Sequence, residues 1–143
     1  MWSSGIDSCI VGTKEMQELI ALQGFMDSSG LDEVLIELVR LRVSRLSGCD
    51  QGARRHLRKA RLLGESSERL DALDGWRGAP MFSAKERAAL EWSDAVICAS
   101  RAGVSDNVQA DVRQWFTEIE LIKLTVLIAV TLAWNRVDLC LGS

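Results

Sequence analysis

Residues 35–64 read LIELVRLRVSRLSGCDQGARRHLRKARLLG, and this stretch indicates two consecutive helices, each ended by a glycine. Apolar residues in the first half recur at the spacing of one helix face, and Gly48 closes it because glycine adopts a left-handed backbone without strain. The second half is rich in Arg, Ala and Leu, which favour helix, and it ends at Gly64.

The same pattern continues on both sides of this stretch. Helices are expected over residues 14–28, 32–46, 49–63, 66–73, 84–101, 106–115 and 117–139. Two helix starts carry a capping box, in which a hydroxyl residue and a glutamate three positions on satisfy backbone N–H groups: Ser83 with Glu86, and Thr117 with Glu120. No segment shows the alternation of a strand, so the sequence predicts an all-α bundle of six to seven helices.

Length and composition narrow the class of protein. A chain of 143 residues suits one domain with a real core, and we expect that domain over residues 13–143, after a flexible segment at 1–12. The net charge of −3 argues against nucleic-acid binding. The four cysteines are too widely spaced for a metal cluster, and neither a metal nor a cofactor is expected. The N-terminus has no signal-peptide pattern, so a cytoplasmic protein with free thiols is expected.

The last expected helix is apolar on all sides. Its most apolar part, residues 124–134, lies between Lys123 and Arg136 and is shorter than the ~20 residues that cross a bilayer. Such a helix is more often buried in a core or covered by a partner subunit. We therefore expect a core helix that also forms a subunit interface, in a homo-oligomer with no membrane role.

The opening stretch also carries two residues suited to chemistry. Cys49 stands at a helix start, where unpaired N–H groups and the helix dipole favour a thiolate, and this predicts a pKa below the ~8.5 of free cysteine. His56, the only histidine of the chain, follows almost two helical turns later, so both side chains are expected on nearly the same face. A half-buried structural cysteine and a surface histidine are the alternative that spacing alone leaves open.

Several motifs together resemble one known family. Over about residues 14–140, the chain resembles the AhpD-like alkylhydroperoxidase/carboxymuconolactone decarboxylase superfamily. Three places carry the resemblance: residues 35–56 with Gly48-Cys49 and His56, the tryptophan loop and following helix at 73–90, and Ala133-Trp134-Asn135-Arg136. The resemblance implies an all-helical AhpD-like fold that assembles into dimers, trimers or hexamers.

One position departs from the family pattern. The peroxidase branch carries Cys-x-x-Cys-x-x-x-His, and here Cys49 and His56 match the first cysteine and the histidine. Gly52 stands where the second cysteine would be. Glu37, twelve residues before Cys49, matches the acidic relay residue of the family. The resemblance therefore implies Glu37, Cys49 and His56 as catalytic residues, with the partner thiol missing.

The first function that follows is a thiol-dependent peroxidase with an antioxidant role, an oxidoreductase of the peroxiredoxin-type alkylhydroperoxidase class. Cys49 would react with the hydroperoxide, while Glu37 and His56 relay protons. A two-cysteine enzyme closes a disulfide and is then reset by an external thiol or dithiol reductant. Without the second thiol, the activity is expected to be weak or altered.

The other cysteines and the glycine position carry further expectations. Cys9 is the best internal candidate for a resolving thiol, whereas Cys98 and Cys140 are expected to pack as small apolar residues. Replacing Gly52 by cysteine is expected to raise peroxidase turnover. The change removes a glycine from a helix, so helix propensity is expected to bring no cost in stability.

Two other functions stay open. In an acid–base enzyme like the decarboxylase branch, Glu37 and His56 would transfer protons on a small acid or lactone, with Arg54 or Arg58 binding its carboxylate. The third possibility is a non-catalytic oligomeric remnant with a binding role, which the loss of the second cysteine favours.

Overall fold

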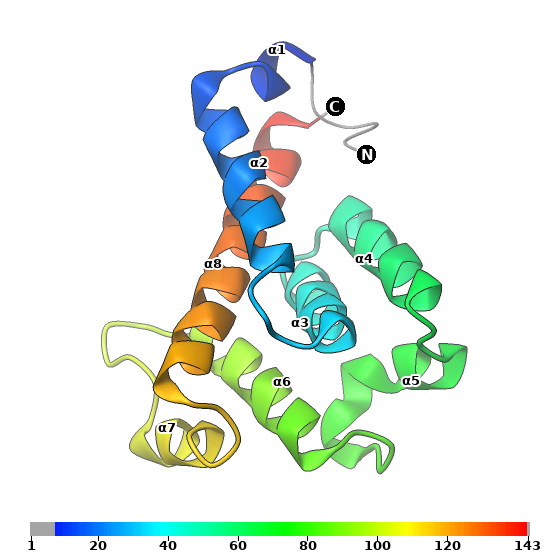
Figure 1. Ribbon diagram of the computed structural model, residues 1–143, viewed down its shortest axis with the longest axis vertical. Helices are drawn as coiled ribbons and strands as arrows, with labels where there is room; N and C mark the ends of the chain where they lie inside the picture. Colours follow the sequence, from blue (N-terminus) through cyan, green and yellow to red (C-terminus); the bar gives the residue numbers. More distant parts are fainter. Residues whose placement is uncertain (1–7, 143) are drawn as a thin grey trace.

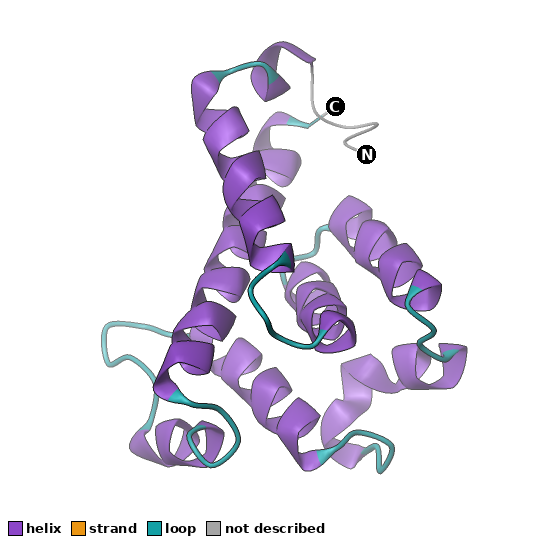
Figure 2. Ribbon diagram, viewed as in Figure 1, coloured by secondary structure: helices purple, strands orange, loops and turns teal. Residues whose placement is uncertain are grey.

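The structure is a computed structural model that describes residues 8–142, with only the backbone described at Ser8 and Cys9. The helices are α1 (Ser8–Val11), α2 (Lys14–Asp27), α3 (Glu33–Leu46), α4 (Asp50–Leu62), α5 (Ser67–Ala72), the 3-10 helix η1 (Leu73–Gly78), α6 (Ala84–Ile97), α7 (Asp106–Val112) and α8 (Glu118–Leu141) (Figure 1). Between residues 8 and 142 there is no strand, only one isolated bridge from Ser100 to Gly103 (Figure 2). The predicted all-α fold is confirmed: residues 8–142 contain seven α-helices of six residues or more, α2 to α8, besides the one-turn α1 and the 3-10 helix η1.

Helix α3 lies at the centre of the molecule. It packs against α4, α6, α8 and η1, so neighbours surround it (Figure 1). Ten consecutive residues of α3, from 35 to 44, are buried. The sequence singled out the apolar C-terminal helix for this role, because α3 carries charged residues that periodicity assigns to a solvent face. The structure buries three of those charged residues, Glu37, Arg40 and Arg42, and gives each an ion-pair partner.

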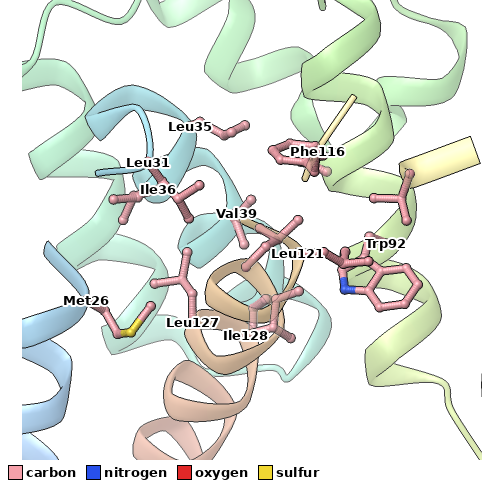
Figure 3. Close-up of a cluster of buried hydrophobic side chains, with 14 residues drawn as sticks. Met26, Leu31, Leu35, Ile36, Val39, Trp92, Phe116, Leu121, Leu127 and Ile128 are labelled. Carbon is pink, nitrogen blue, oxygen red and sulfur yellow. The ribbon is translucent and has the colours of Figure 1, made fainter. Parts of the chain in front are cut away.

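The core consists of two clusters on different sides of α3. The larger one joins α3 to α6 and α8 (Figure 3), and its buried members are Met26, Leu31, Leu35, Ile36, Val39, Val43, Ala89, Trp92, Val112, Phe116, Leu121, Leu124, Leu127 and Ile128. The smaller cluster joins α3 to α4, α5 and η1 through Leu38, Leu41, Ala60, Leu70, Leu73, Trp76, Phe82 and Leu90. Because α3 contributes to both, its position is fixed from both sides.

Most helix boundaries agree with the sequence to within a few residues. Both predicted capping boxes are formed, at the starts of α6 and α8. The expected loop around residues 75–80 begins instead as the 3-10 helix η1, and Arg87 holds its end by donating hydrogen bonds to the carbonyls of Trp76 and Ala79. Helix α6 ends at Ile97, four residues early, before a turn in which Gly103 adopts a φ of 73°.

Helix α8 is long and apolar enough to cross a membrane by length and composition, with a mean hydropathy of 1.6. Its central residues Leu124, Leu127 and Ile128 are buried in the core. The core helix of a soluble protein also meets this criterion of length and hydropathy. Two of its residues nevertheless face outward, since Ile119 and Ile122 are 67% and 62% exposed.

Candidate functional site

The turn between α3 and α4 positions the candidate site. Gly48 adopts a φ of 70°, a left-handed conformation that glycine takes without strain, and the chain reverses there. The Cys49 N–H donates to the carbonyl oxygen of Ser44 at 2.9 Å, which ties the turn to α3. Cys49 is the N-cap of α4 and has an extended backbone, so it stands just outside the helix. That Cys49 and His56 project from nearly the same face of this helix stays a prediction.

The turn brings α3 and α4 together along Glu37 and His56. The Nδ1 atom of His56 lies 2.9 Å from the Oε2 atom of Glu37. The side chains are 2% and 3% exposed, so the hydrogen bond is shielded from water. The structure thus places these two predicted site residues in direct contact.

Cations surround the other oxygen of the Glu37 carboxylate. Arg40, itself 1% exposed, donates from NH1 to Glu37 Oε1 at 3.0 Å, and the Lys59 ammonium lies 3.4 Å from the same oxygen. Asp27 of α2 pairs with both Arg40 and Lys59. A chain of alternating charges therefore links α2, α3 and α4 around Glu37.

This environment sets the charge state of the pair. Burial alone would raise the pKa of Glu37, but the hydrogen bond from His56 and the positive charges of Arg40 and Lys59 outweigh it and hold the pKa below its ordinary value. Burial lowers the pKa of His56, although the hydrogen bond to Glu37 opposes that shift. At neutral pH the pair is thus a carboxylate and a neutral imidazole. Because a carboxylate only accepts hydrogen bonds, Nδ1 carries the proton and Nε2 keeps its lone pair.

A pocket opens beside Glu37. Its volume is about 290 Å³, and it is lined by Asp27, Glu33, Ile36, Glu37, Lys59, Leu62 and Leu63. The apolar wall and the single cation among three carboxylates favour a neutral, largely apolar ligand over an anion. Arg54 and Arg58, which the sequence offered as carboxylate binders, are exposed and do not line this pocket. Among the described residues, no group of three His, Cys, Asp or Glu side chains could hold a metal ion.

Cys49 lies in a different environment from the Glu37–His56 pair. Its thiol is buried at 2% exposure and lies 3.9 Å from the Oδ2 atom of Asp138 on α8. Burial raises the pKa of the Cys49 thiol and Asp138 raises it further, against the lowering effects of the Gly52 backbone N–H and of Arg55. The predicted low pKa is therefore wrong, because helix-start effects are outweighed by loss of water and by a carboxylate that the sequence did not place there.

The space around Gly52 is nearly closed. A Cβ atom at this position would lie 2.8 Å from Asn135 Oδ1, 2.9 Å from Ser44 Oγ and 3.2 Å from Cys49 Sγ. Asn135 donates to Ser44 Oγ at 3.2 Å, while its own Oδ1 is buried without a hydrogen-bond partner. A side chain at 52 would have to push these buried groups aside, so close approach adds a cost in stability to Gly52→Cys that helix propensity does not include.

The remaining cysteines divide into two cases. Cys98 and Cys140 are exposed, so the expectation that they pack as small apolar residues is wrong. Cys98 is the C-cap residue of α6 and lies just beyond the last helical residue, Ile97. The side chain of Cys9 lies outside the described residues, and its proposed resolving role stays a prediction.

Four residues of this region were not foreseen from the sequence. Two of them were partly predictable from the sequence. Arg40 lies three positions after Glu37, and Lys59 lies three positions after His56, so each shares a helix face with a site residue. Asp27 lies at the end of the preceding helix α2 and Asp138 on the distant α8, and only tertiary packing brings them to the site.

Comparison with known proteins places the chain in a family. A profile of the Carboxymuconolactone decarboxylase family matches residues 14–95, from the start of α2 into α6. The uncharacterized protein YdfG of Bacillus subtilis (strain 168) is 26% identical over 133 residues, which cover 93% of this chain and 90% of YdfG.

One solved structure extends the comparison to the fold. It is the crystal structure of ATU0492 from Agrobacterium tumefaciens, a protein of unknown function suggested to be the antioxidant defence protein AhpD. The TM-score is 0.90 at 29% sequence identity, over 97% of this chain and 95% of that one. The predicted AhpD-like fold is confirmed. Since the family match also spans more than half of the sequence and includes Glu37, Cys49 and His56, this chain belongs to the Carboxymuconolactone decarboxylase family.

Proposed function

We propose that this protein is a thiol-dependent hydroperoxide reductase that acts through Cys49, is slow at neutral pH, and uses Glu37 and His56 as its proton-transfer pair. The observation that carries the proposal is the buried 2.9 Å contact between Glu37 and His56, which leaves a neutral imidazole with a free lone pair on Nε2. An antioxidant role in the reducing cytoplasm would suit such chemistry.

The position of residue 52 links this pair to the thiol. Residues 52 and 56 are neighbours on one face of α4, one turn apart. Cys49 Sγ lies 3.2 Å from the point that a Cβ of residue 52 would occupy. The imidazole and the thiol therefore flank the same position, and this neighbourhood supports proton transfer between them along one face of α4.

The reaction is a two-electron oxidation of sulfur. The Cys49 thiol loses its proton towards His56, and the thiolate attacks the O–O bond of the hydroperoxide. Sulfur gains one oxygen as a sulfenic acid, and the other oxygen leaves as an alkoxide that takes back the proton. Glu37 stabilises the imidazolium formed in between, as a carboxylate does in other carboxylate–histidine pairs. Two equivalents of an external thiol then return Cys49 to the thiol and release water and a disulfide.

The test is turnover of tert-butyl hydroperoxide with a dithiol donor. We expect a slow rate that climbs as pH rises above neutral, because the raised pKa of Cys49 limits the thiolate. Cys49→Ser should abolish it, and Glu37→Gln should reduce it by roughly 10²-fold. Cys98→Ser, at an exposed cysteine outside the site, is the matched control. Turnover that survives Cys49→Ser, or falls equally in Cys98→Ser, contradicts the proposal.

A second function has one specific observation in its favour. Glu37 and Lys59 line the 290 Å³ pocket, so the acid–base machinery faces a space for a small neutral molecule such as a lactone. Isomerisation of α-angelica lactone, followed by ultraviolet absorbance, tests it. This function requires activity that persists in Cys49→Ser and is lost in Glu37→Gln but not in Glu33→Gln, a change in the same pocket outside the pair.

A further inference from the structure

Asp138 has no explanation in the proton-transfer pair or in helix stability. It lies in the last turn of α8, where the partial negative charge of the helix end disfavours a carboxylate. Its side chain is nevertheless 4% exposed, so it is also largely removed from water. A carboxylate held at such an unfavourable place is expected to act on the groups that it contacts.

The same oxygen of Asp138 meets a thiol and a guanidinium. Oδ2 lies 3.9 Å from Cys49 Sγ and 3.4 Å from the NH2 atom of Arg55. Arg55 is the cation whose positive charge lowers the pKa of the Cys49 thiol, and Asp138 forms an ion pair with Arg55. The carboxylate therefore acts on Cys49 in two ways, by accepting a hydrogen bond from the thiol S–H and by neutralising the charge that would stabilise a thiolate.

The other groups around the thiol are either uncharged or exposed to solvent. Ser44 from α3 and Asn135 from α8 approach the same point as Cys49 Sγ, and both are uncharged. Asp50, the next residue of α4, is exposed to solvent. The unpartnered Asn135 Oδ1 marks a place where the hydroxyl of an oxidised sulfur would find an acceptor.

We propose that Asp138 is the residue that keeps the Cys49 thiol protonated at neutral pH, by accepting its hydrogen bond and by engaging Arg55. Asp138 is thus a positioning residue that sets how reactive the thiol is, while His56 remains tied to Glu37. The inference deepens the proposed function and rests on it for its biological use. The thiol acidity itself can be measured without any turnover, so the two can fail separately.

The experiment is the rate of Cys49 alkylation by iodoacetamide, followed by peptide mass spectrometry from about pH 6 to about pH 10.5 on the full chain. Asp138→Asn keeps the shape and removes the charge. We expect the pH midpoint to fall by about one unit, with a roughly tenfold faster reaction at neutral pH. A change that merely loosens the fold would expose the thiol and raise the rate plateau at high pH, where the thiol is fully ionised, whereas loss of the carboxylate charge alone lowers the midpoint and leaves that plateau unchanged.

Two further variants make the result decisive. Asp50→Asn removes a carboxylate charge from the exposed residue next to Cys49, at the start of α4, and its midpoint should stay within a few tenths of a unit of the wild type. Arg55→Gln should move the midpoint upward, which keeps the proposal testable even where Asp138→Asn does not fold. An unchanged midpoint in Asp138→Asn, an equal shift in Asp50→Asn, or no upward shift in Arg55→Gln overturns the proposal.

Discussion

At the scale of single residues, position 52 shows how a missing side chain is accommodated. Asn135 and Ser44 are both fully buried, and they occupy the space that a side chain at 52 would need. The Asn135–Ser44 hydrogen bond therefore stands where the second thiol of the family pattern would otherwise pack. Glycine is required at 52 by close approach and not by backbone conformation, since 52 lies inside α4.

This requirement predicts the sign of a stability change. Glycine to alanine inside a helix normally stabilises by roughly 0.5–1 kcal/mol. Gly52→Ala should instead destabilise by about 1–3 kcal/mol, because the new methyl group displaces two buried polar side chains. Urea unfolding measures both. Gly24→Ala in α2, where a Cβ meets nothing within 4 Å, is the control and should stabilise. A Gly52→Ala protein that is also more stable than the wild type would show that the site is not closed.

At the scale of elements, one carboxylate joins three helices. Asp94 of α6 accepts two hydrogen bonds from Arg42 of α3, at 2.8 and 3.0 Å, and one from Trp76 of η1. Arg77 pairs with it from the exposed side of η1. Burial would raise the pKa of Asp94, but these donors, led by Arg42, hold it below its ordinary value of 3.8.

Removing this charge should loosen the packing of α6 on α3. We predict that Asp94→Asn costs about 2–4 kcal/mol at neutral pH, because it leaves the largely buried Arg42 without its counter-charge. The lowered pKa means that this stability is present above pH 3.8 and is lost as pH falls further, so the two proteins should converge in acid. Chemical unfolding at several pH values provides the measurement. Glu91→Gln, which removes an exposed partner of Arg77, should cost less than ~0.5 kcal/mol, and an equal loss in both variants would refute the assignment.

The sequence predicted the helices well because their ends are locally coded. The Ser83 and Thr117 capping boxes and the left-handed Gly48 each act within a few residues, so no tertiary information was needed. What it could not predict depends on packing between distant segments. The burial of Arg40, and the Asp138 carboxylate beside Cys49, follow from contacts across 17 and 89 positions of the chain. The Glu37–His56 pair was predicted only from the family resemblance, which implied a proton-relay role for both residues.

At the scale of the whole molecule, α2 and α8 each leave large apolar side chains exposed. These two helices pack together (Figure 1), and Phe25 of α2 is 70% exposed, alongside Ile119 and Ile122 of α8. Large apolar side chains left in contact with water mark surfaces that other molecules cover. A second copy of the chain is the simplest cover, so we propose a homo-oligomer whose subunits meet through this face.

Light scattering should therefore give a mass that is a multiple of 15.8 kDa. Ile122→Lys places a charge in the proposed interface and should shift the mass toward the monomer. Arg54→Glu, a charge change on an exposed part of α4, should leave it unchanged. A wild-type protein that is monomeric at micromolar concentration contradicts the interface.

The proposed chemistry depends most on the charge state of the Glu37–His56 pair, and the single histidine of the chain makes it directly observable. Nitrogen-15 NMR of the imidazole reports which ring nitrogen carries the proton. We predict a neutral ring at pH 7 with the proton on Nδ1, and a pKa of His56 below the ~6.5 of an ordinary histidine. Glu37→Gln should change this pKa, because the Glu37 carboxylate is the hydrogen-bond partner of the Nδ1 proton. A ring protonated on Nε2 alone, or an imidazolium at pH 7, would show that His56 has no free lone pair on Nε2 and would contradict the proton transfer on which the proposed function rests.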